Sequence, residues 1–202
     1  MKPSGLLCIV SGPSGTGKTS LCKELLRRVP SLHFSVSYTT RPPREGETQG
    51  KDYCFVSKAV FEQMIAENAF AEWAQIYHNY YGTTKASIQQ SLELGIDLLF
   101  DIDPQGAHQL RLQYPEAVSI FVLPPSMLDL ETRLHGRSTD PPEVIAGRLL
   151  KAREEISQAA SYDYLIINDN FDEALSVLQA ILAAEKHRYH RLKEKLLTLE
   201  QE

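Results

Sequence analysis

The stretch Gly-Pro-Ser-Gly-Thr-Gly-Lys-Thr, residues 12–19, fits the phosphate-loop pattern G-x-x-x-x-G-K-[S/T] at every fixed position. An apolar run at residues 6–10 leads into it, and residues 20–29 follow with helical periodicity. This strand–loop–helix order is the setting that the pattern requires. There, backbone N–H groups of the glycine-rich loop and the helix N-terminus point at anionic oxygens. The sequence therefore predicts a nucleoside triphosphate site.

Two side chains of this loop have expected roles. Lys18 is expected to reach the β- and γ-phosphates, and the Thr19 hydroxyl to ligate Mg²⁺. The alternative is an ordinary glycine-rich turn. A chance match in a chain of this length is an event of about one per cent, because glycine makes up only about 7% of residues.

Composition places the chain among single-core globular proteins. It has 202 residues, 43% of them hydrophobic and 23% charged, and no apolar stretch near the roughly 20 residues that span a bilayer. Residues 1–5 lead directly into the first apolar run without a signal-peptide pattern. Cys8, Cys22 and Cys54 are widely spaced and form neither a metal motif nor an even disulfide framework. We expect a reduced, cytoplasmic protein with Cys8 buried in the first strand.

The formal net charge of −5 does not favour broad attraction to nucleic acid or to an anionic membrane, and neither partner is expected. Anionic substrates would need local clusters of arginine to hold them.

Apolar runs alternate with helical patterns, which predicts an α/β fold with a parallel sheet flanked by helices. The expected strands are residues 6–10, 34–37, 96–102, 118–123 and 164–167. Asp103 before Pro104 predicts a capped helix that stops before Pro115, and Ser126 is expected to cap a helix to about Gly136.

Three parts are expected along the chain. The core comprises residues 1–38, 96–125 and 160–202. Residues 39–95 form a small mixed insertion with its own strands, which include residues 53–56 and 70–77, and with helices at 57–68 and 84–94. Residues 126–159 form a helical lid region with a polar, proline-rich break at 137–143.

The tail, residues 185–202, continues a helical pattern with mixed charges and spaced leucines. Two interpretations stay open: a solvated amphipathic helix, which the charges favour, and contact with a second copy of the chain in a homo-oligomer.

Arg41 and Arg44 lie three residues apart beside several hydroxyl side chains. Pro42 and Pro43 keep the chain extended between them, so both guanidinium groups can face one anion. Arginine forks match phosphate oxygens. A solvated basic loop is the alternative interpretation of this stretch.

At this point the chain resembles the guanylate kinases of bacterial type. The resemblance rests on ordered blocks that cover nearly the whole chain except the tail: residues 12–20, 35–44, 50–53, 72–74, 79–83, 101–106, 133–137, 148 and 168–169. It implies transfer of the ATP γ-phosphoryl group to GMP with Mg²⁺ in purine nucleotide metabolism, with dGMP as a further acceptor. It also implies a phosphate-loop NTPase core, a GMP-binding insertion and an ATP-side lid.

The resemblance also implies roles for individual residues of this chain. The GMP side comprises Ser37, Arg41, Arg44, Tyr53, Glu72, Tyr81, Thr83 and Asp103. The ATP side comprises Gly12, Pro13, Ser14, Gly15, Thr16, Gly17, Lys18, Thr19, Ser20, Arg133, Arg137 and Asn168. Thr19 and Asp101 would hold Mg²⁺, directly or through water.

The chain departs from the family pattern at two positions. Thr83 stands where the family often has serine, which keeps the hydroxyl. Ser138 stands where glycine usually follows the lid arginine, which would alter lid flexibility and not chemistry.

The expected chemistry suits these residue types. Guanine presents two donors, N1–H and an amino group, and carboxylates such as Glu72 and Asp103 accept from both. Each carboxylate also has a structural interpretation when taken alone: Asp103 as a helix cap, Glu72 as a solvent-facing strand residue, and Asp101 as a turn residue at the end of a strand. Phosphoryl transfer to an ionised phosphate needs no base, so the expected catalytic residues are cationic: Lys18, Arg41, Arg137 and Arg148. Arg133 is either catalytic or structural, and the histidines are expected to be structural.

Two alternatives are weighed. A kinase for another nucleoside monophosphate is disfavoured by Glu72 and Asp103. A non-catalytic interaction module of guanylate-kinase type is disfavoured because Gly17, Lys18, Thr19 and Asp101 are all present.

Overall fold

The structure is a computed structural model that describes residues 5–76, 78–137 and 141–199. Within these ranges the side chains of Arg137, Glu194, Lys195, Thr198 and Leu199 are not described.

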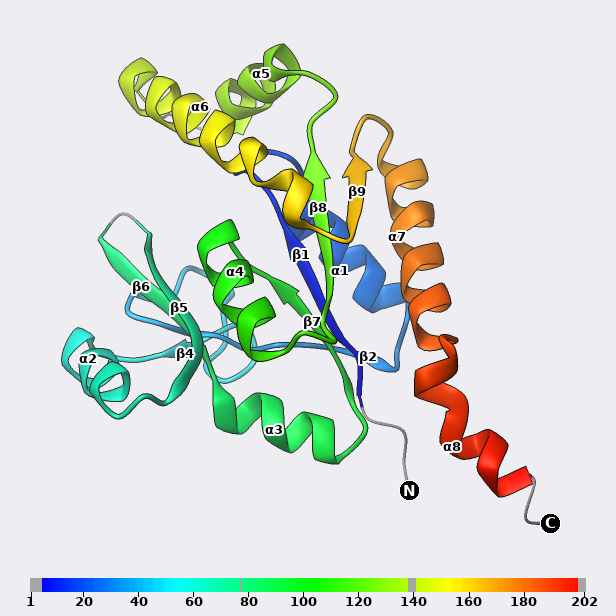
Figure 1. Cartoon of the computed structure of the whole chain (residues 1–202). Coiled ribbons are helices and arrows are strands. Elements are labelled where there is room, and N and C mark those ends of the chain that lie inside the picture. Colours follow the sequence, from blue (N-terminus) through cyan, green and yellow to red (C-terminus); the bar gives the residue numbers. More distant parts are fainter. Residues whose placement is uncertain (1–4, 77, 138–140, 200–202) are drawn as a thin grey trace.

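The core is a five-stranded parallel sheet in the order β2-β7-β1-β8-β9. Its strands are β1 (Leu7–Ser11), β2 (Leu32–Phe34), β7 (Asp97–Asp101), β8 (Val118–Leu123) and β9 (Tyr164–Ile167). All of β1 is buried, because helices cover both faces of the sheet. The predicted α/β class is confirmed (Figure 1).

One strand differs from its prediction: β2 ends at Phe34, whereas we expected residues 34–37. The backbone N–H of Ser35 still donates to Leu99 O at 2.9 Å. The chain then leaves the core sheet, and Tyr38 pairs with Gly82 in a second sheet. A sequence pattern does not distinguish between two sheets that share one extended segment.

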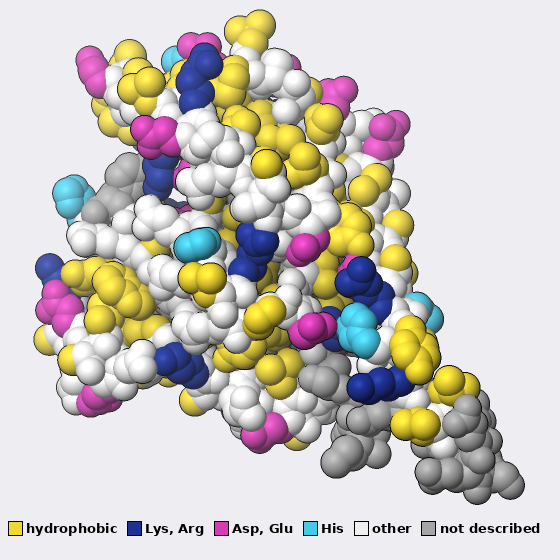
Figure 2. Space-filling model, viewed as in Figure 1, with side chains coloured by type: hydrophobic (Ala, Val, Ile, Leu, Met, Phe, Trp, Pro, Cys, Tyr) yellow, Lys and Arg dark blue, Asp and Glu magenta, His cyan; other side chains and the backbone are white. Residues whose placement is uncertain are grey.

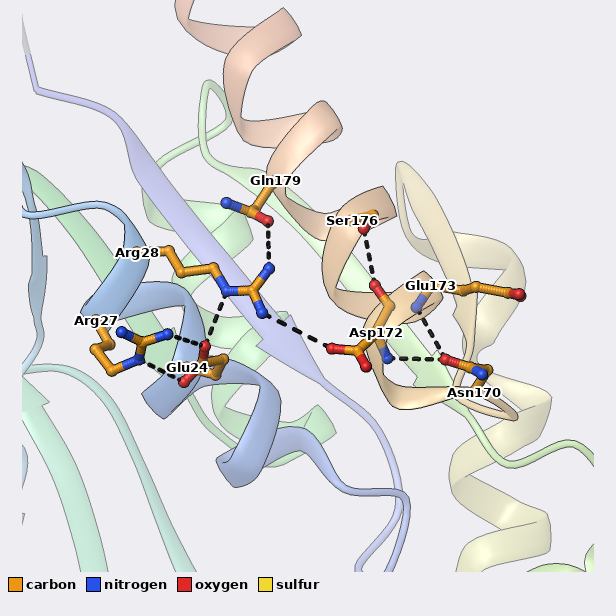
Figure 3. Close-up of polar contacts among 8 residues, drawn as sticks. All are labelled: Glu24, Arg27, Arg28, Asn170, Asp172, Glu173, Ser176 and Gln179. Atoms are coloured by element: carbon orange, nitrogen blue, oxygen red, sulfur yellow. Dashed lines mark hydrogen bonds and ion pairs between the residues drawn. The ribbon is translucent and has the colours of Figure 1, made fainter.

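Helices α1 (Lys18–Arg28) and α7 (Phe171–Lys186) pack side by side on one face of the core sheet. Arg28 connects them through an ion pair with Asp172 at 3.7 Å (Figure 3). The Asn170 side chain caps α7 by accepting from the N–H groups of Asp172 and Glu173. Because the Arg28–Asp172 pair is exposed, it contributes little, and the apolar residues beneath hold α1 and α7 to the sheet.

The other face carries α4 (Pro104–Gln113). The side chain of Asp103 caps it by accepting from Gly106 N at 2.9 Å, and it ends before Pro115 as predicted. Cys8 is buried at 1% exposure, which was also expected.

The predicted insertion has its own four-stranded sheet, in the order β4-β3-β6-β5 (Figure 1, left). Its elements are β3 (Tyr38–Thr39), β4 (Cys54–Phe55), α2 (Lys58–Ala66), β5 (Phe70–Ile76), β6 (Asn79–Thr84) and α3 (Lys85–Glu93). Phe61 of α2 stacks on Phe70 with centroids 4.3 Å apart, which packs that helix on the sheet.

Strand β5 is fastened to α4 of the core by two glutamines. Gln109 accepts from Trp73 N at 3.1 Å and donates to Trp73 O at 2.8 Å. Gln113 donates to Ala71 O at 2.7 Å. These bonds satisfy backbone groups at the outer edge of β5 on both sides of Glu72, and they fix that strand against the helix that Asp103 caps.

The region predicted to be a lid contains α5 (Met127–Arg137), α6 (Pro142–Ser157) and, directly after it, a short 3-10 helix η1 (Ala159–Ser161). The expected cap is present, since Asp129 N donates to Ser126 Oγ at 3.0 Å. The two long helices share a small apolar cluster of Leu130, Leu134, Ile145 and Ala152. Ser138, one of the two departures from the family pattern, lies outside the described residues.

The tail is not one continuous helix. Helix α7 ends at Lys186 with His187 as its cap residue, and α8 (Tyr189–Leu199) follows as a separate helix. Leu196 and Leu197 of α8 are 45% and 52% exposed. Figure 2 shows basic and apolar side chains together where α8 extends at the lower right. In the described part of the chain, no helix has the length and apolar character needed to cross a membrane.

Candidate functional site

The phosphate loop follows β1 and depends on glycine at three positions. Gly12, Gly15 and Gly17 have φ angles of 135°, 94° and 91°. A Cβ on Gly17 would lie 2.4 Å from Asn168 Nδ2, and that nitrogen donates to Thr16 O at 2.7 Å. Side chains are therefore excluded by both conformation and space.

Lys18 begins α1 and folds back over the loop. Its Nζ donates to Gly12 O at 2.5 Å and to Pro13 O at 2.9 Å. Burial lowers the pKa of Lys18, while Asp101 and Glu155 act in the opposite direction. The ammonium group thus lies inside the loop, where a terminal phosphate would meet it.

Thr19 and Asp101 contact each other beside the phosphate loop, where β7 ends. Thr19 Oγ1 donates to Asp101 Oδ2 at 2.6 Å, although the two residues lie far apart in sequence. A hydroxyl and a carboxylate beside a phosphate loop are the hard oxygen donors that Mg²⁺ takes together with phosphate and water. The residues present therefore fit the expected metal.

A cavity of about 430 Å³ opens beside the phosphate loop. The loop, the end of β7, the insertion and α6 all contribute to its walls. Its polar lining includes Lys18, Thr19, Arg44, Asp101, Asp103, Arg148, Lys151 and Glu155.

Lys151 and Glu155 line this cavity although no sequence motif had indicated them. They follow Arg148 by three and seven residues and so lie on the same face of α6, and Lys151 Nζ is 3.6 Å from Glu155 Oε1. The helical spacing from Arg148 was the signal that could have identified them.

A smaller cavity of about 70 Å³ adjoins the first. Ile76, Asp101, Ile102 and Asp103 line both cavities, so the two share a wall at the end of β7. The residues that line only the smaller one are Ser37, Tyr53, Glu72, Ala74 and Tyr81.

Two carboxylates face each other in the smaller cavity. Glu72 is only 3% exposed. Its Oε1 and Oδ2 of Asp103 are buried and accept no hydrogen bond from the residues that the structure describes. Burial raises the pKa of Glu72 to about 7, and the Asp103 charge adds to the rise while Thr83 opposes it. The solvent-facing interpretation of Glu72 is therefore wrong. Asp103 is both a helix cap and a wall of this cavity.

Hydroxyl and cationic groups surround these carboxylates. Ser37 Oγ and Thr83 Oγ1 lie 3.0 Å apart. The Arg41 guanidinium lies over the Tyr53 ring, 5.2 Å from its centroid, and Tyr53 in turn contacts Tyr81 edge-on. Arg44 lines the larger cavity instead. Most of the predicted GMP-side residues thus line one of the two cavities, while Arg41 and Thr83 contact the lining residues Tyr53 and Ser37.

A third cavity, of about 390 Å³, lies on the other side of the phosphate loop. Gly15, Gly17, Ser20, Arg133 and Asn168 line it. Arg133 Nη2 donates to Asn168 O at 2.8 Å, so this arginine has a structural contact within the predicted ATP side. The side chain of Arg137 lies outside the described part of the chain.

A parallel sheet, a glycine loop at the end of its central strand and a Thr19–Asp101 pair define a nucleotide-binding protein of the phosphate-loop α/β class. The model of the guanylate kinase family matches residues 4–185. The chain belongs to the guanylate kinase family.

Relatives agree over nearly the full length. The chain is 51% identical to a guanylate kinase of Syntrophotalea carbinolica, covering 96% of this chain and 92% of that protein. It is 50% identical to a guanylate kinase of Escherichia coli K12, covering 95% and 93%. The crystal structure of a guanylate kinase from Anaplasma phagocytophilum superposes with a TM-score of 0.79 at 33% identity, covering 98% and 96%.

Gly106 gives a first test of the carboxylate pair. A Cβ at this position would lie 2.6 Å from Glu72 Oε2 and 3.4 Å from Asp103 Oδ1. We expect Gly106→Ala to displace the Glu72 carboxylate and raise the KM for GMP several-fold. The melting temperature of the variant should not fall below that of the unaltered protein, because alanine is favoured over glycine in a helix by about 1 kcal/mol. Unchanged KM with an unchanged melting temperature would contradict this placement.

Proposed function

We propose that the protein transfers the γ-phosphoryl group of ATP to GMP, giving ADP and GDP, with Mg²⁺ as the metal and dGMP as a further acceptor. The observation that carries the proposal is the pair of buried carboxylate oxygens, Glu72 Oε1 and Asp103 Oδ2, in a cavity that shares a wall with the phosphate-loop cavity.

The pair suits guanine better than adenine. Guanine N1–H and its amino group are adjacent donors, whereas adenine presents an acceptor at N1. Leaving a buried carboxylate opposite an acceptor costs its hydrogen bond, and polar sites of this kind reject the wrong base by about 10⁴–10⁵. Ser37 and Thr83, 3.0 Å apart, add hydroxyl groups to the same pocket.

The acceptor phosphate would lie between Arg41, Arg44, Tyr53 and Tyr81. Lys18 of the phosphate loop and Arg148 of α6 line the larger cavity, where the donor phosphate would lie. Because the acceptor oxygen is already ionised, these groups have to align the two phosphates and neutralise charge, and no base is required. Mg²⁺ bound through Thr19 and Asp101 would supply further neutralisation of the phosphate oxygens.

The ATP nucleoside would occupy the third cavity, where Arg133 and Asn168 lie beside the phosphate loop. We propose that residues 126–159 act as the lid, that residues 39–95 form the GMP-binding part, and that Arg137 joins Arg148 when the lid closes. Closure would exclude water, which competes as a phosphoryl acceptor. We also propose that the protein is cytoplasmic and forms a homo-oligomer in which the tail contacts a second copy of the chain.

A coupled assay for ADP tests the proposal. ADP formation should require ATP, Mg²⁺ and GMP together, and AMP, CMP or UMP should replace GMP at a rate lower by about 10⁴. No ADP with any monophosphate, despite a folded protein that binds GMP, would favour a non-catalytic interaction module. Equal rates with GMP and AMP would instead favour another monophosphate kinase.

The pKa of Glu72 predicts a pH dependence of base binding. At pH below about 7 the free protein carries a protonated Glu72, so guanine binding must release a proton. We expect affinity for guanosine, which lacks a titrating phosphate, to rise between pH 5.5 and 7 and to level off above. Calorimetry in buffers of different ionisation enthalpy at about pH 6 measures the released proton. A flat profile between these values would contradict an ionised Glu72 in the complex.

A further inference from the structure

We propose that Glu47 is a positioning residue: it binds one edge of the Arg41 guanidinium and so orients the other edge toward the acceptor phosphate. The inference rests on the proposed function, in which Arg41 binds that phosphate. Nothing in the phosphate-loop pattern or in the paired arginines pointed to Glu47.

The contact is a bidentate ion pair. Arg41 Nη1 donates to Glu47 Oε2 and Nη2 to Oε1, both at 2.8 Å. The side chains are only 11% and 20% exposed, unlike those of a solvated surface pair. Parallel bonds of this kind fix the plane of the guanidinium as well as its position.

Glu47 also organises the second arginine. Its Oε2 accepts from Arg44 N at 2.7 Å, and its own N–H donates to Arg44 O at 3.1 Å across a turn in which Gly46 has a φ of 83°. Arg41 and this Arg44 N–H hold the pKa of Glu47 down at about 2, so the carboxylate is ionised at any working pH. One carboxylate therefore ties the side chain of Arg41 to the backbone of Arg44.

Glu47 occupies one edge of the Arg41 guanidinium, and the N–H groups of the other edge are available to a phosphate. Among the residues that the structure describes, Nη1 donates to Pro42 O and to Glu47, and Nη2 donates to Glu47. The donors left are Nε–H and the second Nη2 hydrogen, which are adjacent and form the other fork of the guanidinium. Rings of Tyr53 and Phe55 lie 5.2 and 5.7 Å from the guanidinium carbon, and the Tyr81 hydroxyl also interacts with the group. An oriented fork beside a phenol suits a phosphate group.

Glu47 could instead compete with the phosphate for Arg41. The two roles predict opposite changes in GMP affinity when Glu47 is removed. Competition for one fork would make removal of Glu47 strengthen GMP binding. Positioning makes removal weaken it, because the long arginine side chain must then be ordered by the ligand itself. The second fork holds no carboxylate of the described residues, and this favours positioning.

The test compares Glu47→Gln with Glu45→Gln, an exposed residue of the same loop whose loss changes the charge equally. Calorimetry gives the Kd for GMP and for guanosine, which lacks the phosphate. We expect Glu47→Gln to weaken GMP binding by about 10-fold or more, as for loss of a charge-assisted hydrogen bond, with guanosine binding unchanged. KM for GMP should rise more than kcat falls, and Glu45→Gln should resemble the unaltered protein. Glu47→Asp, which keeps the charge but is shorter, should also weaken GMP binding and serves if the first variant folds poorly.

A double-mutant cycle with Arg41→Met completes the test, because the effect of Glu47→Gln should vanish in that background. Tighter GMP binding by Glu47→Gln, or an equal loss with and without Arg41, would overturn the inference alone. If the unaltered protein binds GMP no better than guanosine, the phosphate site itself is wrong, and the inference falls with it.

Discussion

Lys18→Ala is expected to abolish phosphoryl transfer while the protein stays folded. Lys18 Nζ lies within the phosphate loop, bonded to Gly12 O and Pro13 O, where a γ-phosphate would replace those carbonyl partners. A single cation that meets charge developed in the transition state of phosphoryl transfer supplies about 10³–10⁵ in rate. We therefore expect kcat in the coupled ADP assay to fall by at least about 10³.

The matched control is Lys23→Ala, which removes an exposed lysine from the same helix. It should leave kcat and both KM values unchanged. GMP binding by Lys18→Ala should also persist, because the small cavity is lined by other residues. Turnover by Lys18→Ala near the normal rate would refute the assignment of the phosphate loop.

Glu72→Gln is expected to remove selective use of GMP and to leave ATP binding intact. The amide would present a donor toward guanine donors in a site where Glu72 is 3% exposed and water is largely excluded. Loss of a charge-assisted hydrogen bond from such a site costs about 1.5–3 kcal/mol, so kcat/KM for GMP should fall by about 10²-fold. The Kd for ATP should not change.

Stability separates this effect from misfolding. The raised pKa of Glu72 means that its ionised form is disfavoured in the folded protein, so its contribution to the free energy of unfolding is largest below pH 4.5 and lost toward pH 7. A neutral glutamine should therefore melt no lower than the unaltered protein at pH 8. Glu67→Gln, an exposed change in the same insertion, is the control. Equal losses for GMP and ATP would argue against a base-reading role, and Trp73 fluorescence during GMP titration gives an independent readout.

Much of the fold could be predicted because its signals are local. Residues 118–123 and 164–167 are largely apolar runs, and both form strands with those bounds. The side chains of Asp103 and Ser126 cap N–H groups within one helical turn, so their positions in the sequence were sufficient to predict where these helices begin. The predictions for β2 and for the tail were wrong in their bounds: β2 ends where the chain pairs with a strand distant in sequence, and the tail is interrupted at His187.

The candidate site divides in the same way. A phosphate loop is contiguous, so its glycines, Lys18 and Thr19 could be identified without coordinates. Only the tertiary structure brings Asp101 to Thr19 at 2.6 Å and places Glu72 beside Asp103. The physical reason is the separation in sequence between the residues that interact. Loop conformation and helix capping are set by neighbouring residues, whereas burial and contacts such as that of Thr19 with Asp101 depend on which distant segments the sheet brings together.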